Sequence, residues 1–237
     1  MSNHPFRQLQ IDLAERINSL PAETRLPSEP TLAKELGVSR ATLREAMRSF
    51  EGRGMIRRRQ GVGTFVAAKV PVMDTGLEVL ESLETIAQRS GLTVRIGELE
   101  VQKVAADGES AAKLNLEVGA ELTCVKRIIF TDYRPIAFLV DTLPMNVLGI
   151  DEIQSGFTGS VLDLLLRRGD PKLTQSRTEI KAIGATSEVA RALQIQRGDV
   201  LLHFAAQLHA EDCRVVDYSI SYFLPGYFRF HVVRRVG

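Results

Sequence analysis

The 237-residue sequence contains no tryptophan and only two cysteines. Cys124 and Cys213 both lie in apolar, strand-like runs, and neither has a CxxC pattern or a pair of histidines nearby. Such cysteines usually serve as small core residues, so we predict no redox or zinc site, no bound metal and no cofactor. The low cysteine content also favours a reducing compartment.

Membrane-directing segments and common enzyme motifs are absent as well. No apolar run approaches the roughly 18 residues of a membrane-spanning helix. Residues 1–10 show no basic segment followed by an apolar one, so we expect a cytoplasmic protein without a membrane partner. We find no nucleophile elbow, HExxH pattern or phosphate-binding loop, and the four histidines are scattered. These absences argue against an enzyme.

Charge is unevenly distributed along the chain. Residues 1–69 contain 12 Lys/Arg and 7 Asp/Glu, whereas residues 70–237 contain 18 and 22, and together they give the formal net charge of +1. A basic segment joined to an acidic one indicates a division of labour, in which the basic part suits a polyanionic partner.

The basic segment has the pattern of two helices joined by a glycine turn, after a first amphipathic helix over residues 6–20. Ser28 is the expected N-cap of a short second helix that ends at Gly37, and Ser39 caps a third. The third helix has an apolar face of Leu43, Ala46, Met47 and Phe50 and a polar face of Arg40, Ala41, Arg44, Glu45 and Arg48. In a helix-turn-helix, the helix after the turn, here the third helix, lies in the major groove of DNA.

A glycine-tipped hairpin follows this helix. Within residues 55–66, two short β-prone runs flank a Gly-x-Gly turn at Gly61 and Gly63, and three successive arginines lie on the first arm. An arginine-rich helix face alone is usually only a solvated surface, and a Gly-x-Gly hairpin alone usually has no role in DNA binding. Their succession after the helix-turn-helix predicts a winged helix that binds duplex DNA.

Three blocks of this segment resemble the DNA-binding domain of the GntR family of regulators, over roughly residues 6–67. The blocks are Leu26-Pro27-Ser28-Glu29, Gly37-Val38-Ser39-Arg40-x-Thr42-Leu43-Arg44-x-Ala46 and Gly61-x-Gly63-Thr64-Phe65-Val66. The resemblance implies a homodimer on a near-palindromic operator. It also implies DNA contacts from Ser39, Arg40, Thr42, Arg44, Gln60 and Gly61. Pro30 stands where many members have a DNA-contacting arginine, so operator preference is expected to differ.

Chemistry is consistent with these implied contacts. Arginine offers a planar fork to guanine O6 and N7, worth about 1–3 kcal/mol of base discrimination per bidentate pair. The short hydroxyls of Ser39 and Thr42 suit phosphates, which set register without reading sequence. Which of Arg40 and Arg44 reads a base remains open at this point.

The remainder of the chain is predicted to be rich in strands. A break with a proline and a glycine at residues 69–76 suggests three parts: a DNA-binding domain at 1–69, a linker and connecting helix at 70–92, and a second domain at 93–237. We expect a helix over residues 77–90. Strands are expected at 93–104, 121–131, 136–143, 174–183, 200–209 and 215–224.

One unit occurs twice in this second domain. Residues 111–122 resemble residues 190–201, and each stretch is followed by a β-run, a polar turn, a second β-run and Leu-Pro. Two copies packed about a pseudo-twofold axis would give one antiparallel sheet with helices to one side, which is an α+β domain. A cleft between the halves is the expected ligand pocket.

Residues 93–233 resemble the ligand-sensing UTRA domain of the HutC-type branch of the same family. The residues carrying the resemblance include Arg127, Asp132-x-x-Pro135-Ile136-Ala137, Gly159-Ser160-Val161-Leu162, Gly198-Asp199-Val200-Leu201-Leu202 and Asp217-Tyr218-Ser219-x-Ser221-Tyr222. The resemblance implies a chorismate-lyase-like fold and a small-molecule effector bound at Arg127, Ser160 and Tyr222, with Asp217 nearby. Ile129 and Leu139 replace an arginine and a glutamate of phosphosugar-sensing members, which argues against a phosphorylated ligand.

Each effector residue also has a structural interpretation. Arg127 could face solvent or an ion-pair partner, Ser160 could cap the helix expected at 161–168, and Tyr222 could belong to an aromatic core. Two rival functions remain open: an enzyme on the chorismate-lyase fold, and a constitutive DNA-binding protein whose large domain only dimerises. The function we favour is a ligand-responsive transcriptional regulator, a repressor released by its effector.

Overall fold

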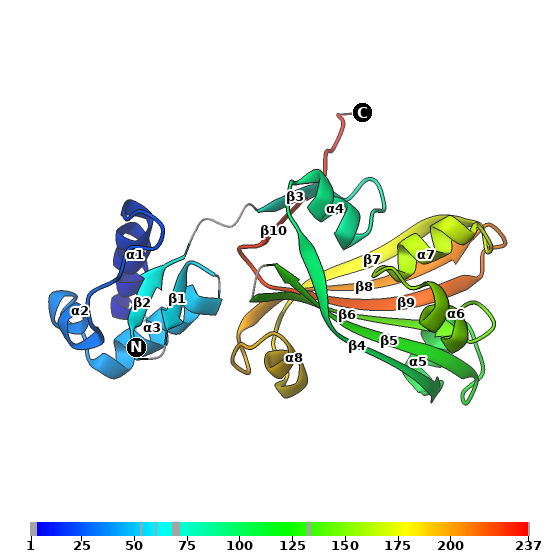
Figure 1. Ribbon diagram of the computed structural model, residues 1–237, viewed down its shortest axis with the longest axis horizontal. Helices are drawn as coiled ribbons and strands as arrows, with labels where there is room; N and C mark the ends of the chain where they lie inside the picture. Colours follow the sequence, from blue (N-terminus) through cyan, green and yellow to red (C-terminus); the bar gives the residue numbers. More distant parts are fainter. Residues whose placement is uncertain (1–3, 53, 60, 68–71, 132–133, 237) are drawn as a thin grey trace. The chain divides into compact units, whose positions relative to one another are not determined.

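The computed structural model describes residues 4–52, 54–59, 61–67, 72–131 and 134–236. The chain divides into two compact units. The first is formed by the residues up to Val72 together with Pro225–Tyr227, and the second by the rest of the chain from Met73 onward (Figure 1). The two units are described separately below.

The N-terminal unit has the predicted order of helices and hairpin. Its elements are α1 (His4–Ser19), α2 (Glu29–Glu35), α3 (Arg40–Gly52), β1 (Ile56–Arg59) and β2 (Gly63–Val66). Ser28 and Ser39 cap α2 and α3, since their hydroxyls accept hydrogen bonds from Thr31 N (3.4 Å) and Thr42 N (3.1 Å). Gly37, at φ +65°, forms the turn between the two helices. The predicted helix-turn-helix is therefore confirmed.

The core of this unit fixes the direction in which α3 faces. Leu43 and Phe50 are fully buried, together with Leu13 of α1 and Leu32 of α2. Each buried side chain of this size contributes about 1.5–3 kcal/mol to stability. Because the apolar face of α3 is held in this core, its polar face must point away from it.

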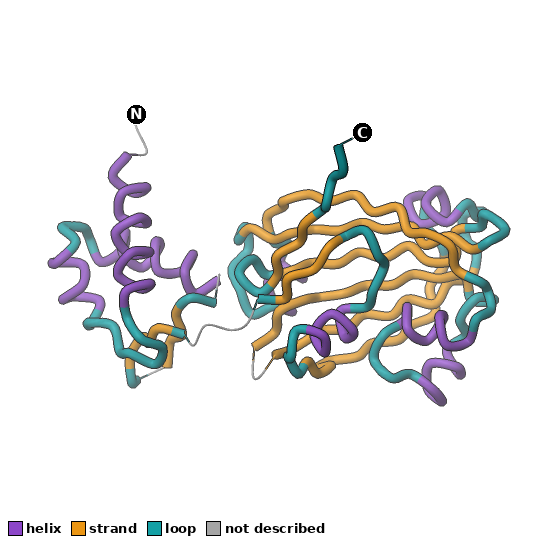
Figure 2. The backbone as a smooth tube through the Cα atoms, turned by 90° about the horizontal axis from the view of Figure 1, so that it is seen from above, coloured by secondary structure: helices purple, strands orange, loops and turns teal. Residues whose placement is uncertain are grey.

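The second unit is built on a six-stranded antiparallel sheet in the order β4-β5-β6-β9-β8-β7 (Figure 2). The strands are β4 (Val94–Ala105), β5 (Glu121–Thr131), β6 (Arg134–Pro144), β7 (Leu173–Gly184), β8 (Val200–Ala210) and β9 (Val215–Phe223). All six strands were predicted, with ends that differ by at most two residues.

The sequence repeat is a structural repeat. The sheet has two equivalent halves, β4-β5-β6 and β7-β8-β9, which meet where β6 pairs with β9. Asn115 and Gln194 both leave their helices in the left-handed region, at φ 55° and 53°, and Gly119 and Gly198 both have φ +89°. The two copies are therefore related by a pseudo-twofold axis between the central strands.

The two faces of the sheet carry different helices. These helices are α5 (Gly108–Leu114), α6 (Ile150–Gly156), α7 (Val161–Arg168) and α8 (Ser187–Ala192). The repeat helices α5 and α8 cover one face, which we call the α5/α8 face, as shown by Leu114 packing with Tyr218 and Glu188 pairing with Lys126. The opposite α6/α7 face buries Leu165 of α7.

Our expectation of helices on one side thus holds for the repeat helices alone. The segment between the two copies was not considered in that expectation. It supplies Leu148, Ile153 and Val161 to a second core with Val125 and Leu143 of the sheet. Because these apolar side chains can be buried only against the uncovered face, the sheet is packed on both sides.

The segment before the sheet differs from the expectation. The helix predicted at residues 77–90 begins only at Leu83, as α4 (Leu83–Arg89), and β3 (Met73–Gly76) precedes it. Leu77 and Leu80 are exposed, at 37% and 46%, so the apolar pattern that suggested a longer helix does not face a core. β3 instead pairs in parallel with β10 (Phe228–His231), a contact between distant parts of the chain.

Candidate nucleic-acid interface and ligand site

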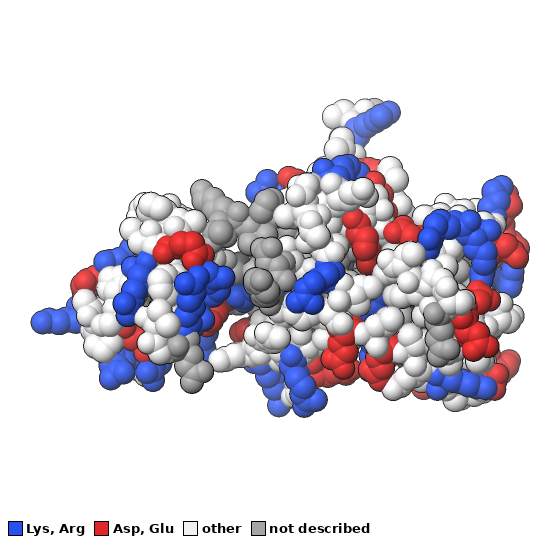
Figure 3. Space-filling model, in the orientation of Figure 1, with Lys and Arg blue, Asp and Glu red and all other residues white. Residues whose placement is uncertain are grey.

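The outward face of α3 concentrates positive charge. Arg40, Arg44 and Arg48 are all exposed on this face, and Figure 3 shows Lys and Arg side chains gathered over the N-terminal unit. Ion-pair partners differ along the helix: Arg48 pairs with Glu45 (3.0 Å), whereas no carboxylate among the described residues lies within ion-pair distance of Arg40. Arg40, in the first helical turn, is thus available to a phosphate or base edge.

Ser39 and Thr42 lie together at the start of α3. Their hydroxyl oxygens are 2.8 Å apart, and Ser39 Oγ also accepts a hydrogen bond from Thr42 N. Both hydroxyls sit at the N-terminal end of the helix, where backbone N–H groups also favour a phosphate. The predicted phosphate-binding pair is therefore brought together.

Arg44 is held by an acidic residue of α2 that the sequence analysis did not single out. Arg44 Nε donates to Glu29 Oε2 at 2.6 Å, and Arg58 Nη2 of the hairpin lies 3.6 Å from the other oxygen of the same carboxylate. Glu29 thus links the second helix, the third helix and the hairpin. Its place inside the Pro-Ser-Glu block was the only signal in the sequence.

The hairpin has the arrangement expected of a wing. β1 and β2 pair antiparallel from Ile56↔Val66 to Arg59↔Gly63, and the three arginines of β1 are all exposed. Arg57 and Arg59 both pair with Glu23, at 2.9 and 2.8 Å. Gly61 has φ +74° and open space where a side chain would be, so the DNA backbone can approach this residue closely. Gln60, the other predicted wing contact, lies outside the described residues.

On the α6/α7 face of the sheet, Arg127 is buried in a cluster of acidic groups. Only 5% of the residue is exposed. Its Nη2 donates to Asp141 Oδ2 at 2.9 Å, and its Nη1 donates to the carbonyl of Gly159 and lies 3.5 Å from Glu84 Oε1. Its Nε is buried without a hydrogen-bond partner among the described residues. The ion-pair interpretation of Arg127 is therefore correct, and one donor remains unused.

Ser160 and Asp217 lie on the same face as Arg127. Ser160 is buried and caps α7, since its hydroxyl accepts a hydrogen bond from Asp163 N at 3.0 Å. Asp217 is buried and accepts a hydrogen bond from Thr142 N at 3.2 Å. Burial, reinforced by the neighbouring charge of Asp141, raises the pKa of the Asp217 carboxyl well above its ordinary value.

Tyr222 is not brought together with these three residues. It pairs in register with Phe138 and His203, whereas Arg127 is in register with Leu139 and through it with Ser221. Since neighbouring residues of a strand point to opposite faces, Tyr222 lies on the α5/α8 face. There its ring stacks on Phe138, with centroids 5.9 Å apart.

The fold and these surfaces define a class of protein: a DNA-binding regulator with a separate sensory domain. Two family descriptions match the chain, "Bacterial regulatory proteins, gntR family" over residues 7–66 and "UTRA domain" over residues 89–229. The chain belongs to the gntR family and carries a UTRA domain, and it is a ligand-responsive DNA-binding transcriptional regulator.

Relatives and solved structures agree with this assignment. The chain is 30% identical to the HTH-type transcriptional regulator Rv0792c of Mycobacterium tuberculosis, over 90% of this chain and 78% of the relative. It is 32% identical to the histidine utilization repressor of Pseudomonas putida, over 78% and 73%. The crystal structure of PhnF from Mycobacterium smegmatis has the same fold, with a TM-score of 0.63 at 20% identity, over 97% of this chain and all of that one. No helix in the described ranges is long and apolar enough to cross a membrane.

Proposed function

We propose that this regulator binds operator DNA as a homodimer through α3 and the hairpin, and that a small-molecule effector releases it, so that it acts as a cytoplasmic repressor rather than an enzyme. The proposed DNA contacts are Ser39, Arg40, Thr42, Arg44, Gln60 and Gly61. The observation that carries the proposal is the outward arginine face of α3, which is fixed by the buried apolar face beneath it.

Within α3 the structure supports a division of roles. Arg40 lies between Ser39 and Thr42 and is free to reach a phosphate or base edge, whereas Arg44 is oriented by Glu29. A guanidinium whose rotamer is fixed before binding loses less entropy when it docks on a base. We therefore assign base reading to Arg44 and backbone contact to Arg40.

The effector site is proposed on the α6/α7 face, with Arg127, Ser160 and Asp217 as contacts. Arg127 is surrounded by Asp141, Glu84 and Asp217, so its charge is already compensated. An anionic ligand would have to displace these carboxylates, and a neutral or cationic polar ligand is favoured. Tyr222, on the other face, can contribute only to a separate contact.

Binding to DNA is tested first. Full-length protein is offered random double-stranded oligonucleotides, and selected sequences are titrated with wild type, Arg44→Ala and Arg214→Ala, which changes an exposed arginine of the second unit. We expect Arg44→Ala to lose at least tenfold in affinity for the selected sequence and Arg214→Ala to match wild type. Recovery of no preferred sequence by wild type would sink the proposal.

Regulation by a ligand is tested second. A metabolite library is screened for compounds that raise the melting temperature and weaken operator binding, with an expected coupling of about 5- to 150-fold. Sedimentation of the free protein reports the homodimer. Operator binding that no compound weakens would overturn the proposed release by an effector.

A further inference from the structure

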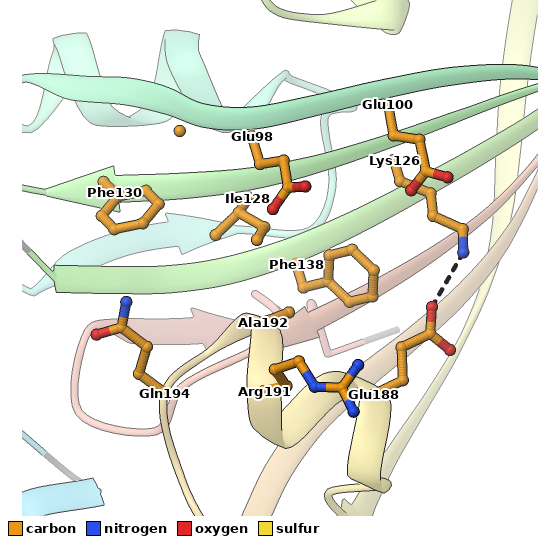
Figure 4. Close-up of a pocket in the computed structure, with 11 residues that line it drawn as sticks. Glu98, Glu100, Lys126, Ile128, Phe130, Phe138, Glu188, Arg191, Ala192 and Gln194 are labelled. Atoms are coloured by element: carbon orange, nitrogen blue, oxygen red, sulfur yellow. Dashed lines mark hydrogen bonds and ion pairs between the residues drawn. The ribbon is translucent and has the colours of Figure 1, made fainter.

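The α5/α8 face holds a pocket of about 390 Å³ between α8 and strands β4, β5 and β6. Its floor is formed by Ile128, Phe130 and Phe138, and polar side chains stand around it (Figure 4). This volume is within the range of small-molecule sites. The pocket lies on the opposite side of the sheet from Arg127, so it is separate from the effector site proposed above.

In the other half of the pseudo-twofold repeat, α5 is hydrogen-bonded to the sheet at the corresponding place. There Gln207 Nε2 donates to the carbonyl of Lys113 in α5 at 2.7 Å, and the Tyr218 hydroxyl donates to Glu109 at 3.4 Å. These two bonds tie α5 to the sheet.

Strand register identifies the residues of the first copy that are equivalent to Gln207 and Tyr218. Ile128 is equivalent to Gln207 and Phe138 to Tyr218, because Ile128 pairs with Phe138 across β5 and β6 as Gln207 pairs with Tyr218 across β8 and β9. Neither Ile128 nor Phe138 carries a side-chain group that can bond to α8. The strands of the first copy therefore carry an apolar floor where those of the second copy carry two polar ties.

The edge strand β4 is distorted at the pocket. The β4–β5 register shifts between Ile96 and Leu99, which is a bulge, and the bulge contains Gly97 and Glu98, both of which line the pocket. A Cβ on Gly97 would clash with the Phe130 ring, so only glycine lets this ring pack against β4. Bulges of this kind redirect side chains, here the carboxylate of Glu98.

Polar groups at the rim are unequally satisfied. Lys126 and Glu188 pair with each other at 3.0 Å. No ion-pair partner among the described residues lies within reach of Arg191 or of Glu98. Figure 4 shows the Phe138 ring between Glu98, which comes from β4, and Arg191, which comes from α8. A cation and an anion thus stand unpaired across an apolar floor.

We propose that this pocket is a second small-molecule site, which takes a small zwitterion with an ammonium and a carboxylate at the two ends of an apolar or aromatic body. The carboxylate is bound by Arg191 and the ammonium by Glu98 and Glu100, while the body lies on Ile128 and Phe138. Compounds with one charge make only one of these two charge-assisted contacts and bind less tightly.

The test uses the full chain and three matched probes, 4-(aminomethyl)benzoate, 4-methylbenzoate and 4-methylbenzylamine, with affinities measured by calorimetry or ligand-observed NMR. We expect the zwitterion to bind at least tenfold more tightly than either single-charge probe. Arg191→Ala should weaken binding of the zwitterion and of 4-methylbenzoate about tenfold and leave 4-methylbenzylamine unchanged. Arg197→Ala, an exposed arginine outside the pocket, is the matched control.

A second variant uses the other repeat as its template. Ile128→Gln introduces the residue found at the equivalent position 207, and it should abolish binding of all three probes. No binding by wild type, or binding that neither Arg191→Ala nor Ile128→Gln reduces, overturns the proposal. Operator affinity is titrated in parallel. Failure of operator binding would count against the proposed function, whereas failure of probe binding with normal operator affinity would count only against this pocket.

Discussion

Arg44 Nε and Glu29 Oε2 lie 2.6 Å apart, so a charged residue of α3 is positioned by a charged residue of α2. The arginine is half exposed, whereas the glutamate is more shielded, with 21% of its side chain accessible. Exposed pairs of this kind contribute only about 0–1 kcal/mol to stability. The main consequence of the pair is therefore the direction in which the guanidinium points.

We predict that Glu29→Gln reduces sequence discrimination more than overall DNA affinity. The amide can still accept a hydrogen bond, but it no longer holds Arg44 by charge and no longer repels phosphates. The ratio of affinities for the selected operator and for unrelated DNA should fall about fivefold, measured by fluorescence anisotropy at fixed salt. Glu45→Gln, which changes a carboxylate paired with Arg48 on the same helix, should leave the ratio unchanged. A rise in the ratio for Glu29→Gln would contradict the orienting role.

Arg127→Ala is predicted to destabilise the second unit as well as alter ligand response. The substitution leaves Asp141 buried without its guanidinium partner, and breaking a buried ion pair from one side costs about 3–5 kcal/mol. The loss should shrink as pH falls, because an unpaired buried carboxyl takes up a proton. Urea denaturation between pH 5 and 8 measures both effects.

The double variant Arg127→Met with Asp141→Asn separates the two consequences of losing Arg127. It removes both charges, so it should recover most of the stability lost in Arg127→Ala while still lacking the proposed effector contact. An effector response in the double variant would show that Arg127 has only a structural role.

Asp217 predicts a pH dependence of opposite sign to that of most carboxyl groups. Because its folded-state pKa is raised above the ordinary value of about 3.9, the folded state holds a proton that the unfolded state releases. Its contribution to stability is present at low pH and is lost as pH rises through the raised pKa. Asp217→Asn should therefore be more stable than wild type at pH 8, with a difference that vanishes toward pH 4.

Asp212 provides the control for this pH dependence. Its carboxyl accepts a hydrogen bond from Arg214, which lowers its pKa, so Asp212→Asn should give no gain in stability at pH 8. An equal gain from both variants would mean that general charge repulsion, and not burial of Asp217, sets the pH dependence.

The sequence predicted the fold best where the pattern is local or repeated. Three such features depend on a few neighbouring residues: the cap at Ser39, the glycine turn at Gly37 and the apolar residues of the six long strands. β3 was missed because it has only four residues and its partner β10 lies about 150 residues away. No local pattern reveals such a pairing.

The candidate sites were predictable as residue types and less so as contacts. Ser39, Thr42 and Arg44 lie where the helix-turn-helix pattern implies, but the carboxylate of Glu29 that holds Arg44 comes from another helix. Asp141 was likewise missed. Its signal in the sequence was an acidic residue at a position of an apolar strand that alternation places on the buried side. Partners across elements depend on register, which the sequence alone does not state.

The helix-turn-helix requires a left-handed backbone conformation at Gly37, and the substitution Gly37→Ala tests this requirement by adding a single methyl group. It has φ +65°, and no atom lies within 4 Å of an added Cβ, so Gly37→Ala introduces backbone strain without a steric clash. We predict a loss of about 1–2 kcal/mol in stability, measured by urea denaturation. Gly108→Ala has equal space at the start of α5 and no left-handed φ, so its stability should be unchanged or slightly higher. If Gly37→Ala were as stable as Gly108→Ala, the turn would have another backbone conformation, and the recognition surface of α3 would have to be placed anew relative to α2.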